Sequence, residues 1–394
     1  MELVIFGLTL LGVALFHRRA LTVALVGFVL TAFVQVISSP AGINAQASEV
    51  IVHLAGEWVA LANLFLLLLG FAILANHFEQ SNLPEVIPSR LPDGWWGGVA
   101  LLAFVFALSI FLDNIAGAII GGVIARHVYP KGVTIGFMAA IVAAANAGGA
   151  GSVIGDTTTT MMWVRGISPL QLAPAFIGAV AAFAFFAPLA TFQQQRLSAL
   201  SRGKTSAVQI DWIRVLIVLT ILITIIGVNV VGNTLFPGLE KTAPALGLGL
   251  WIAIFVTTAF RTPQWHVLIE ASKGATFLVV LVALASLMPV NQLPSPSSFS
   301  VFGLGLLSAV FDNIPLTALA LNQGGYDWAL LAYAVGFGGS MVWFGSSAGV
   351  ALTNLFPEGR SVVQWLQHGW SIVVAYVVGF LVMLAVTGWR PQTL

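Results

Sequence analysis

The chain has no cysteine among its 394 residues, and only 7% of its residues are charged. The absence of cysteine excludes a disulfide framework, a thiolate nucleophile and a cysteine-based metal site. A soluble domain carries about 25% charged residues, so this charge content excludes an ordinary water-soluble protein. The 15 Lys and Arg nearly balance the 14 Asp and Glu, which argues against a nucleic-acid-binding protein. With 59% hydrophobic residues, the chain is expected to be an integral membrane protein whose main partner is the lipid bilayer.

Long apolar runs fill most of the chain. A hydrocarbon core about 30 Å thick needs about 20 helical residues. Single spans are expected at 2–16, 20–38, 52–77, 132–164, 168–191, 210–231, 243–260, 264–288, 328–355 and 361–388. The first is expected to be a retained span and not a signal peptide, because its basic cluster follows the apolar stretch. Two further segments, about 94–128 and 297–322, carry an Asp-Asn pair near their middle, and we expect them to be re-entrant hairpins.

The distribution of Lys and Arg predicts the orientation, because cytoplasmic loops are enriched in them. With both termini outside, the external side holds only Arg165, Lys241 and Arg390. The cytoplasmic side holds Arg18, Arg19, Arg90, Arg126, Lys131, Arg196, Arg202, Lys204, Arg214, Arg261, Lys273 and Arg360. We therefore expect external N- and C-termini.

Three short motifs occur in both halves in the same order. They are His53–Glu57 with His266–Glu270, Asp113-Asn114 with Asp312-Asn313, and the glycines 148, 149 and 155 with 338, 339 and 345. An odd number of spans per half inverts the second copy, an architecture found in secondary transporters. We predict an all-α polytopic membrane protein of about 10 transmembrane helices plus two re-entrant hairpins. Its inverted-topology repeats are 1–191 and 210–394, joined by a cytoplasmic linker at 192–209.

The first hairpin is expected to place Asp113 deep in the membrane. An ionised carboxylate in hydrocarbon is costly, and irregular backbone at that depth must face protein or a water-filled cavity. Asp113 and Asn114 are therefore expected to face a polar cavity. The simpler alternative is that they only cap the second arm of the hairpin, where Asp and Asn are preferred. The pair recurs as Asp312-Asn313, and Pro315 marks the helix start there.

The span at 132–164 has a sequence that disfavours a plain helix. Four glycines within eight positions precede Asp156 and four threonines, which favours local unwinding. Carbonyls freed by such a break, together with Asp156, Ser152 and the hydroxyls of Thr157, Thr158 and Thr159, suit a hard cation. Close helix packing is the alternative reading of the glycines, but it leaves Asp156 unexplained. The span at 328–355 repeats the break with Ser346 in the place of Asp156.

These motifs also resemble a known family. Asp-Asn in a hairpin, Asn146-Ala-Gly-Gly-Ala through Thr160, a second Asp-Asn-Ile-Pro and a Gly-rich segment ending in Gly345-Ser-Ser-Ala-Gly-Val350 are similar to NhaD-type sodium/proton antiporters of the ion-transporter superfamily. The resemblance covers the chain from about residue 50 onward. It implies no cofactor, with Na⁺ and H⁺ as the transported ions. It also implies a homodimer with a scaffold and a mobile transport domain, in the bacterial inner (plasma) membrane.

The resemblance implies a set of ion-binding residues as well. For the cation and proton it implies Asp113, Asn114, Asn146, Asp156, Thr158 and Thr159, with Na⁺ expected at Asp113, Asn114, Asn146, Asp156 and Thr158. The second half is implied to contribute Asp312, Asn313, Ser340, Ser346 and Ser347.

Charge then separates the branches of that superfamily. Asp113, Asp156 and Asp312 lie inside the expected membrane region with no Lys or Arg at that depth, which disfavours an anionic substrate. We predict a secondary transporter that exchanges Na⁺ or Li⁺ for H⁺ and is not an enzyme. The first alternative is Na⁺- or H⁺-coupled transport of another solute, such as arsenite or an organic anion. A channel or a membrane enzyme comes after it.

Two His-Glu pairs stand apart from this set. His53 with Glu57 and His266 with Glu270 have i,i+4 spacing, but both are expected near the membrane surfaces, where a structural role is the simpler one. Lys273 is expected to form an ion pair with Glu270.

Overall fold

The computed structural model describes residues 1–16, 19–38, 43–86, 90–200, 209–236, 242–289 and 292–392. All regular secondary structure in these residues is helical, which confirms the all-α class. Within them, six helices are long and apolar enough to cross a membrane: Ala20–Ile37, Trp58–Glu79, Pro169–Leu197, Trp212–Gly232, Val267–Ser286 and Trp370–Thr387. Residues 201–208 of the expected linker, with Arg202 and Lys204, lie outside the described residues, as do Arg18 and Lys241.

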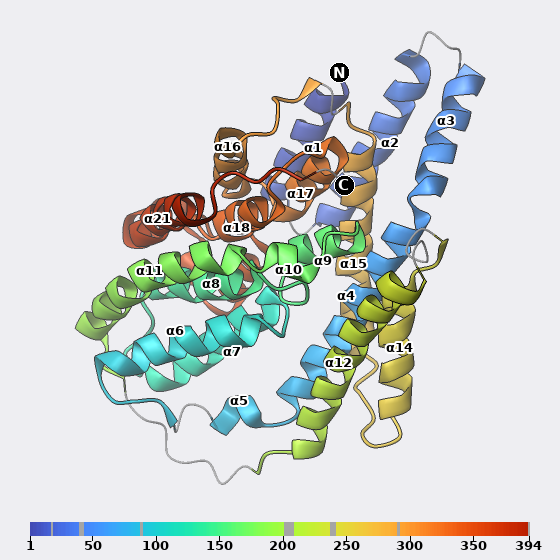
Figure 1. Cartoon of the computed structure of the whole chain (residues 1–394). Coiled ribbons are helices and arrows are strands. Elements are labelled where there is room, and N and C mark those ends of the chain that lie inside the picture. Colours follow the sequence, from blue (N-terminus) through green and yellow to red (C-terminus); the bar gives the residue numbers. More distant parts are fainter. Residues whose placement is uncertain are drawn as a thin grey trace.

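One group of helices, called here the scaffold group, runs along one side of the molecule (Figure 1). It comprises α1 (Glu2–Leu15), α2 (Ala20–Ser38), α3 (Ile43–Gly56), α4 (Trp58–Glu79), α12 (Trp212–Leu235), α14 (Ala245–Thr257) and α15 (Val267–Ser286). In this group α15 packs on α4 and α2, and α14 packs on α4 and α12. The short helix α5 (Leu83–Val86) follows α4.

The remaining helices form a second group, called here the core group. It comprises α6 (Trp95–Ser109), α7 (Asn114–Val128), α8 (Ile135–Gly149), α9 (Thr157–Val164), α10 (Pro169–Leu172), α11 (Ala175–Leu197), α16 (Ser298–Ser308), α17 (Asn313–Gln323), α18 (Trp328–Gly338), α19 (Ser347–Leu355), η4 (Pro357–Arg360), α20 (Val362–His368) and α21 (Trp370–Thr387). The two groups meet mainly where α15 packs on α17 and α4 packs on α9.

The helix interruptions lie where the sequence predicted them. The hairpins 94–128 and 297–322 are α6–α7 and α16–α17, and the broken helices are α8–α9 and α18–α19. The second arm of each hairpin packs on the broken helix of the other half, α7 on α19 and α17 on α9. Two of the expected single spans are divided. The span 52–77 is α3 and α4, because the chain bends at Glu57, and α3 begins nine residues earlier, at Ile43. The span 361–388 is α20 and α21, which are separated at Gly369.

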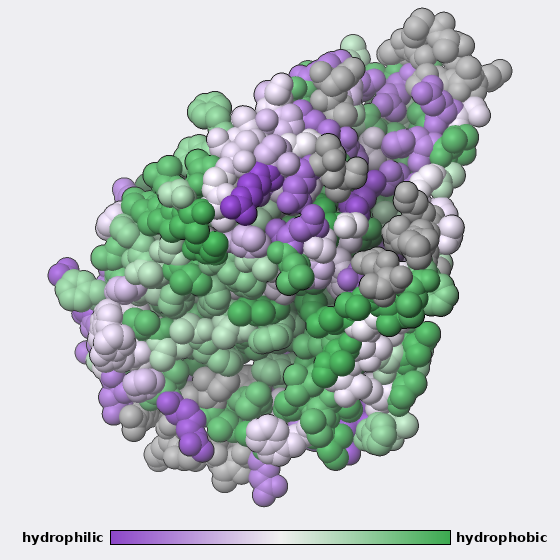
Figure 2. Space-filling model, viewed as in Figure 1, coloured by the Kyte–Doolittle hydropathy of each residue, from purple (hydrophilic) through white to green (hydrophobic). Residues whose placement is uncertain are grey.

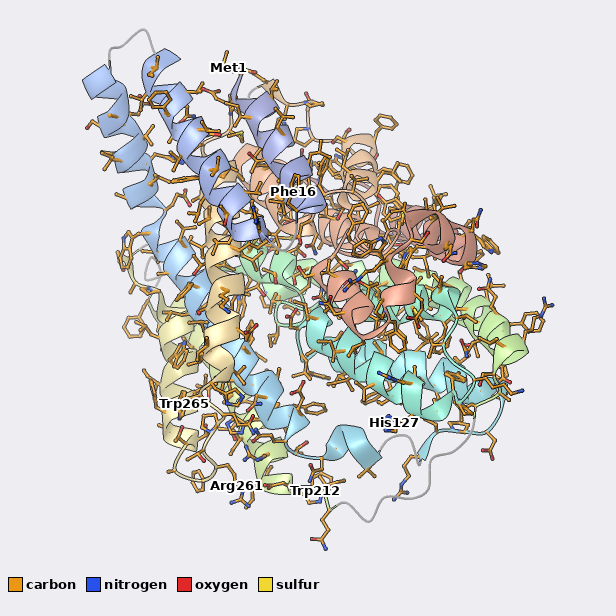
Figure 3. All side chains as sticks on the ribbon, turned by 180° about the vertical axis from the view of Figure 1, so that it is seen from behind. Met1, Phe16, His127, Trp212, Arg261 and Trp265 are labelled. Atoms are coloured by element: carbon orange, nitrogen blue, oxygen red, sulfur yellow. The ribbon has the colours of Figure 1, made fainter. Side chains whose placement is uncertain are left out.

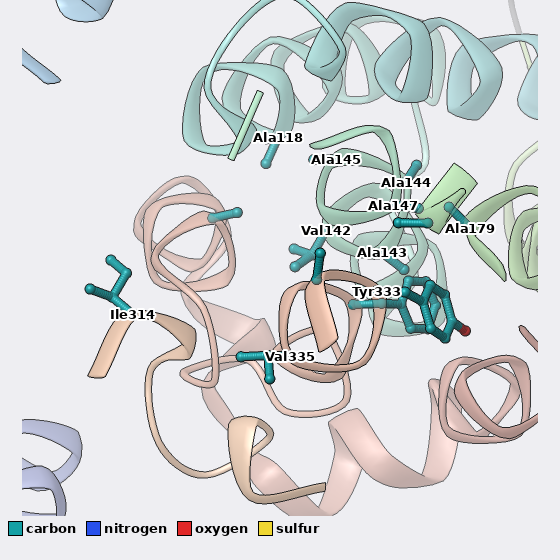
Figure 4. Close-up of a cluster of buried hydrophobic side chains, with 14 of the residues drawn as sticks. Ala118, Val142, Ala143, Ala144, Ala145, Ala147, Ala179, Ile314, Tyr333 and Val335 are labelled. Carbon is teal, nitrogen blue, oxygen red and sulfur yellow. The ribbon is translucent and has the colours of Figure 1, made fainter. Parts of the chain in front are cut away.

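Small side chains at the centre of the core group allow its helices to approach closely. Every residue of α8 from Gly136 to Gly149 is buried, and a helix that is apolar on all sides belongs in a protein interior. Figure 4 shows Ala143, Ala144 and Ala147 of this helix between their neighbours, close to Tyr333 of α18. Alanine in such positions favours van der Waals packing of helices inside a membrane.

The surface is apolar over a broad area, as a membrane protein requires. Figure 2 shows a wide hydrophobic region across the middle of one face, with hydrophilic residues gathered above it and at its lower edge. Figure 3 places Trp212, Arg261 and Trp265 toward one end of the molecule and Met1 at the other. Trp residues at the ends of spanning helices are typical of membrane interfaces.

A cluster of charged residues lies at the N-terminus of α12. The Asp211 carboxylate accepts hydrogen bonds from the backbone N–H groups of Ile213 (3.1 Å) and Arg214 (3.3 Å), which makes it the N-cap of α12. Arg261, which follows α14, donates through Nε to the same carboxylate at 3.0 Å. This hydrogen bond lowers the pKa of Asp211. Because Asp211 N–H donates to the Ser81 carbonyl, one residue joins three segments of the scaffold group.

Candidate ion-binding site

Four helices begin at the interruptions of the two halves, and each begins with a polar cap. Asp113 precedes α7, Asp156 precedes α9, Asp312 precedes α17 and Ser346 precedes α19. A helix N-terminus has free N–H groups and a partial positive charge that stabilises a carboxylate. The caps therefore hold three carboxylates inside the core group, and Ser346 takes the place that Asp156 has in the first half.

Asp156 lies at the centre of the site and is 2% exposed. One carboxylate oxygen accepts hydrogen bonds from the amide of Asn114 at 3.2 Å and from the amide of Asn313 at 3.4 Å. The other oxygen accepts from the hydroxyl of Thr158. Asn114 comes from the first hairpin and Asn313 from the second, so both halves of the chain stabilise one buried charge by hydrogen bonds.

Asn146 makes the second connection between the halves and is fully buried. Its carbonyl oxygen accepts from the Asn114 amide at 3.0 Å. Its own amide donates to the hydroxyls of Ser340 (2.9 Å) and Ser346 (3.1 Å) in the opposite broken helix. The site is thus one continuous network from Asp156 through two asparagines to two serines.

Asp312 stands beside this network with its own partners. Its carboxylate accepts from the backbone N–H of Ile314 at 3.1 Å and from the Ser347 hydroxyl at 3.2 Å. The capping role considered for the hairpin acids is therefore real at this tip. Asp113 occupies the matching N-cap position at the other tip and lines the same cavity as Asp156.

Two predicted site residues support the backbone of the break. Ser152 donates to the Ile110 carbonyl at 2.5 Å and accepts from the N–H of Gly155 at 3.2 Å, which ties the break to the hairpin tip. Thr159 donates to the carbonyls of Ser152 (2.5 Å) and Asp156 (2.8 Å). Of the other two threonines, Thr158 contacts the Asp156 carboxylate and Thr157 lines the cavity.

The repeated glycines mark close approaches that are the same in both halves. A Cβ on Gly148 would meet the Phe106 carbonyl oxygen, and one on Gly338 would meet the Gly305 carbonyl oxygen. A Cβ on Gly155 would meet the Ser109 carbonyl oxygen, and one on Gly345 would lie 2.6 Å from the Ala309 carbonyl oxygen. The packing reading of the glycines is therefore correct for these positions, and it brings the acids together rather than replacing their role.

A cavity of about 370 Å³ leads to this network. Its wall includes Asp113, Asn114, Asp156, Thr157, Asn313 and Ser347, and no Lys or Arg is among the described residues that line it. Four of its polar residues were not expected from the sequence: Asn76 and Glu79 of α4, Glu270 of α15 and Thr160 of α9. Asn76 carried a signal, since it is a polar residue in an apolar span, but its direction depends on tertiary packing. A second cavity, of about 300 Å³, is lined by Asp312, Ser347 and Asn354.

The donor set is one of oxygens with few charges. Among the described residues, no three His, Cys, Asp or Glu side chains gather in a way that could hold a metal ion. The Thr158 hydroxyl contacts the Asp156 carboxylate, and the other neutral oxygens of the network belong to the Asn146 amide and the hydroxyls of Ser340 and Ser346. Few carboxylates among neutral oxygens suit a hard cation of low charge.

Of the two His-Glu pairs, Glu270 lines the cavity, and the other three residues do not. Glu57 does not pair with His53 but forms a two-point ion pair with Arg165, 108 residues away. Lys273 lies 3.5 Å from Glu270, as expected. His77 is 1% exposed, and its Nδ1 lies 2.9 Å from the Arg214 guanidinium.

No family model matches the chain, but several curated proteins are similar to it. Sodium/proton antiporter 1 of Arabidopsis thaliana is 27% identical over 89% of this chain and 66% of that protein. This chain therefore spans just under two thirds of the plant relative's length. The Na⁺/H⁺ antiporter NhaD of Vibrio cholerae is 25% identical over 93% of this chain and 86% of that protein. The NhaD of Alkalimonas amylolytica is 27% identical over 63% of this chain and 59% of that protein.

A solved structure, the YdaH transporter of Alcanivorax borkumensis, matches with a TM-score of 0.46 and 14% identity, over 90% of this chain and 91% of that chain. The curated relatives confirm the resemblance to NhaD-type antiporters that the motifs indicated. The names of these relatives are those of transporters and not of enzymes.

Proposed function

We propose that this protein exchanges Na⁺ or Li⁺ for H⁺ across the membrane by alternating access. The observation that carries the proposal is the buried Asp156 carboxylate, shared by both halves and reached from a cavity whose described lining has acids but no Lys or Arg. Relatives named sodium/proton antiporters support it. An acidic cavity attracts a cation and repels an anion, which argues against an organic-anion substrate.

Exchange follows from competition for one carboxylate. Asn114, Asn313 and Thr158 donate hydrogen bonds to Asp156 and compensate its charge. A sodium ion held by Asp113, Asn114, Asn146, Asp156 and Thr158 supplies that compensation instead, and so does a proton on Asp156. Since either ion satisfies the same charge, binding of one excludes the other.

The second half contributes neutral ligands and one further acid. Asn313 brings an amide N–H donor to the network, Ser340 and Ser346 bring hydroxyl oxygens, and Asp312 with Ser347 adds a carboxylate beside it. The C-terminal ends of α8 and α18, at the two breaks, offer backbone carbonyls. Such carbonyls coordinate cations in transporters with broken helices.

Ion exchange in liposomes tests the proposal. Purified protein with a pH dye inside the vesicles is challenged in turn with Na⁺, Li⁺, K⁺ and a dicarboxylate. We expect proton movement on adding Na⁺ or Li⁺. Proton movement driven only by the carboxylate would show that the protein transports another solute coupled to H⁺, and conductance without counter-transport would show a channel.

The setting of the transporter is part of the same proposal. We propose a homodimer in the bacterial plasma membrane with both termini outside, in which the two halves are inverted repeats. The unequal distribution of Lys and Arg supports the orientation. Cross-linking in native membranes tests the dimer, and a reporter fused to either terminus tests the side.

A further inference from the structure

The interface between the scaffold group and the core group differs at the two ends of α4. Toward the Glu79 end, α4 and α15 are separated from the hairpin tips by the cavity of about 370 Å³. Toward the Glu57 end, the same two helices pack against α9 and α17 around a void of only about 20 Å³. The 22 residues of α4 rise about 33 Å at about 1.5 Å per residue. One helix therefore has an open end and a closed end.

The closed end carries an ion pair across the two groups. Arg165 directly follows α9, whose N-cap is Asp156, and Glu57 directly precedes α4. Both guanidinium Nη atoms donate to the two Glu57 carboxylate oxygens. The side chains are only 28% and 17% exposed, and the fork geometry of Arg fits a carboxylate at two points. Asn322 of α17 adds a hydrogen bond to the Ala285 carbonyl of α15 at 2.9 Å.

We propose that Glu57 and Arg165 are positioning residues that hold α9 against α4, and that their ion pair must separate when the site opens at this end. The inference rests on the alternating access of the proposed function. Since α9 is a helix that connects Asp156 to Arg165, a movement that exposes Asp156 at the closed end also moves Arg165 away from Glu57. Two half-buried charges separate only when water replaces their partner, so ion-pair opening and water entry occur together.

Thiol labelling tests the proposal, since the chain has no cysteine of its own. Ala60→Cys reports the closed end, because Ala60 lines the small void. Gly274→Cys reports the open end, because Gly274 lines the cavity and has free space for a side chain. Each is labelled in liposomes with a membrane-impermeant thiol reagent, in chains with Glu57 and with Glu57→Gln.

We expect the thiol reagent to label Ala60→Cys at least about fivefold faster in the chain with Glu57→Gln than in the chain with Glu57. A change of about fivefold is the size of a typical coupling between two sites. Labelling of Gly274→Cys should become slower, because the population that is open at its end decreases. Exchanging the charges, Glu57→Arg with Arg165→Glu, should restore both rates. Equal rates with and without Glu57→Gln would overturn the proposal, and so would faster labelling at both ends, which indicates general loosening.

A cross-link provides a second measurement, which does not depend on whether Glu57→Gln perturbs the fold. A bifunctional thiol reagent joins Glu57→Cys to Arg165→Cys, and each single variant treated with the same reagent is the control. We expect the joined chain to stop Na⁺/H⁺ exchange and the single variants to continue. Normal exchange in the joined chain would reject the ion pair as a gate. If the unmodified protein exchanges no ions, the proposed function fails, while the labelling rates still test the gate.

Discussion

At the residue scale, the chemistry depends on which groups compensate the buried charge of Asp156. Three neutral donors do so, and two of them, Asn114 and Asn313, come from opposite halves. Hydrogen bonds to a charged group contribute about 1.5–3 kcal/mol each, so the carboxylate tolerates burial. A cation can replace these hydrogen bonds. The asparagine amides can then present their oxygen to the cation, and the threonine hydroxyl can rotate to do the same.

The first prediction concerns Asp156 itself. Asp156→Asn keeps the size of the side chain but removes the charge and the titration, so exchange should fall to the background of empty liposomes. The variant should remain folded, as measured by its elution from a sizing column and its melting temperature. Normal exchange by a folded Asp156→Asn protein would remove this residue from the mechanism and leave Asp113 and Asp312 as the candidates.

The second prediction compares the acids. Asp113→Asn should reduce exchange nearly as much as Asp156→Asn, because Asp113 lines the same cavity. Glu358→Gln is the matched control, since Glu358 is exposed and lies in η4, away from the cavity. Exchange rates at saturating Na⁺ measure both. If Asp113→Asn exchanged at the control rate, Asp113 would be only a helix cap.

The sequence could identify the central residues but not how their partners are oriented. Asp156 and Asn114 were predictable because polar residues inside an apolar segment need a polar surrounding, whereas Asn146 entered only through the family resemblance. Ser152 and Thr159 were expected as cation ligands, but their hydroxyls donate to backbone carbonyls, and only the path of the break decides this. The partner of Glu57 could not be predicted, since Arg165 is 108 residues away and His53 offered a local choice.

At the element scale, the helix interruptions bring the acids together. The glycines were a sequence signal for a break, and Asp113 and Asp312 were considered as helix caps; the structure adds Asp156 as the cap of α9. The length of α3 was not predictable from hydropathy, because residues 43–51 include polar Asn44, Gln46 and Glu49. The helix that contains them, α3, is separated from α4 by the bend at Glu57.

The third prediction concerns the packing at one break. A Cβ on Gly155 would collide with the backbone carbonyl of Ser109, and backbone cannot move aside as a side chain does. Gly155→Ala should therefore destabilise the protein by about 1–3 kcal/mol and reduce exchange. Gly227→Ala in α12 is the control: its Cβ meets no atom within 4 Å, and removing helical glycine should stabilise by about 0.5–1 kcal/mol. Equal melting temperatures for the two variants in detergent would contradict this explanation.

The fourth prediction concerns the start of α12. The Arg261 hydrogen bond lowers the pKa of Asp211, so the folded state favours the ionised carboxylate. Its stabilising effect is complete above the unfolded-state pKa, near 3.9, and is lost as the pH falls through the lower folded-state value. Asp211→Asn should therefore lower the melting temperature at pH 7, and the difference from the unmodified protein should disappear in strong acid. A difference that persists unchanged at pH 2 would show that the ionised cap is not responsible.

At the scale of the whole molecule, the scaffold group and the core group meet mainly through α4 with α9 and α15 with α17. Within the core group, by contrast, the hairpins and broken helices are interlocked, since α7 packs on α19 and α17 packs on α9. Irregular backbone cannot be exposed to lipid, so under the proposed alternating access the hairpins and broken helices move together. The repeats in the sequence indicated such a unit, but the assignment of the other helices to the scaffold group follows only from the packing.

The last prediction separates movement within the core group from movement between the groups. Phe106 of α6 and Phe176 of α11 are in ring contact inside the core group, with centroids 6.4 Å apart. Asn322 of α17 and Ala285 of α15 face each other between the groups. With no native cysteine, each pair can be replaced by two cysteines and joined by the same bifunctional reagent in liposomes. Joining Phe106→Cys to Phe176→Cys should leave Na⁺/H⁺ exchange nearly unchanged, because both helices move as one body. Joining Asn322→Cys to Ala285→Cys should stop it, because these helices must slide past each other when the site changes sides.

The four single-cysteine proteins treated with the reagent control for modification alone. If the first cross-link stopped exchange and the second did not, the moving unit would have to be divided through the core group instead of along its border with α4 and α15.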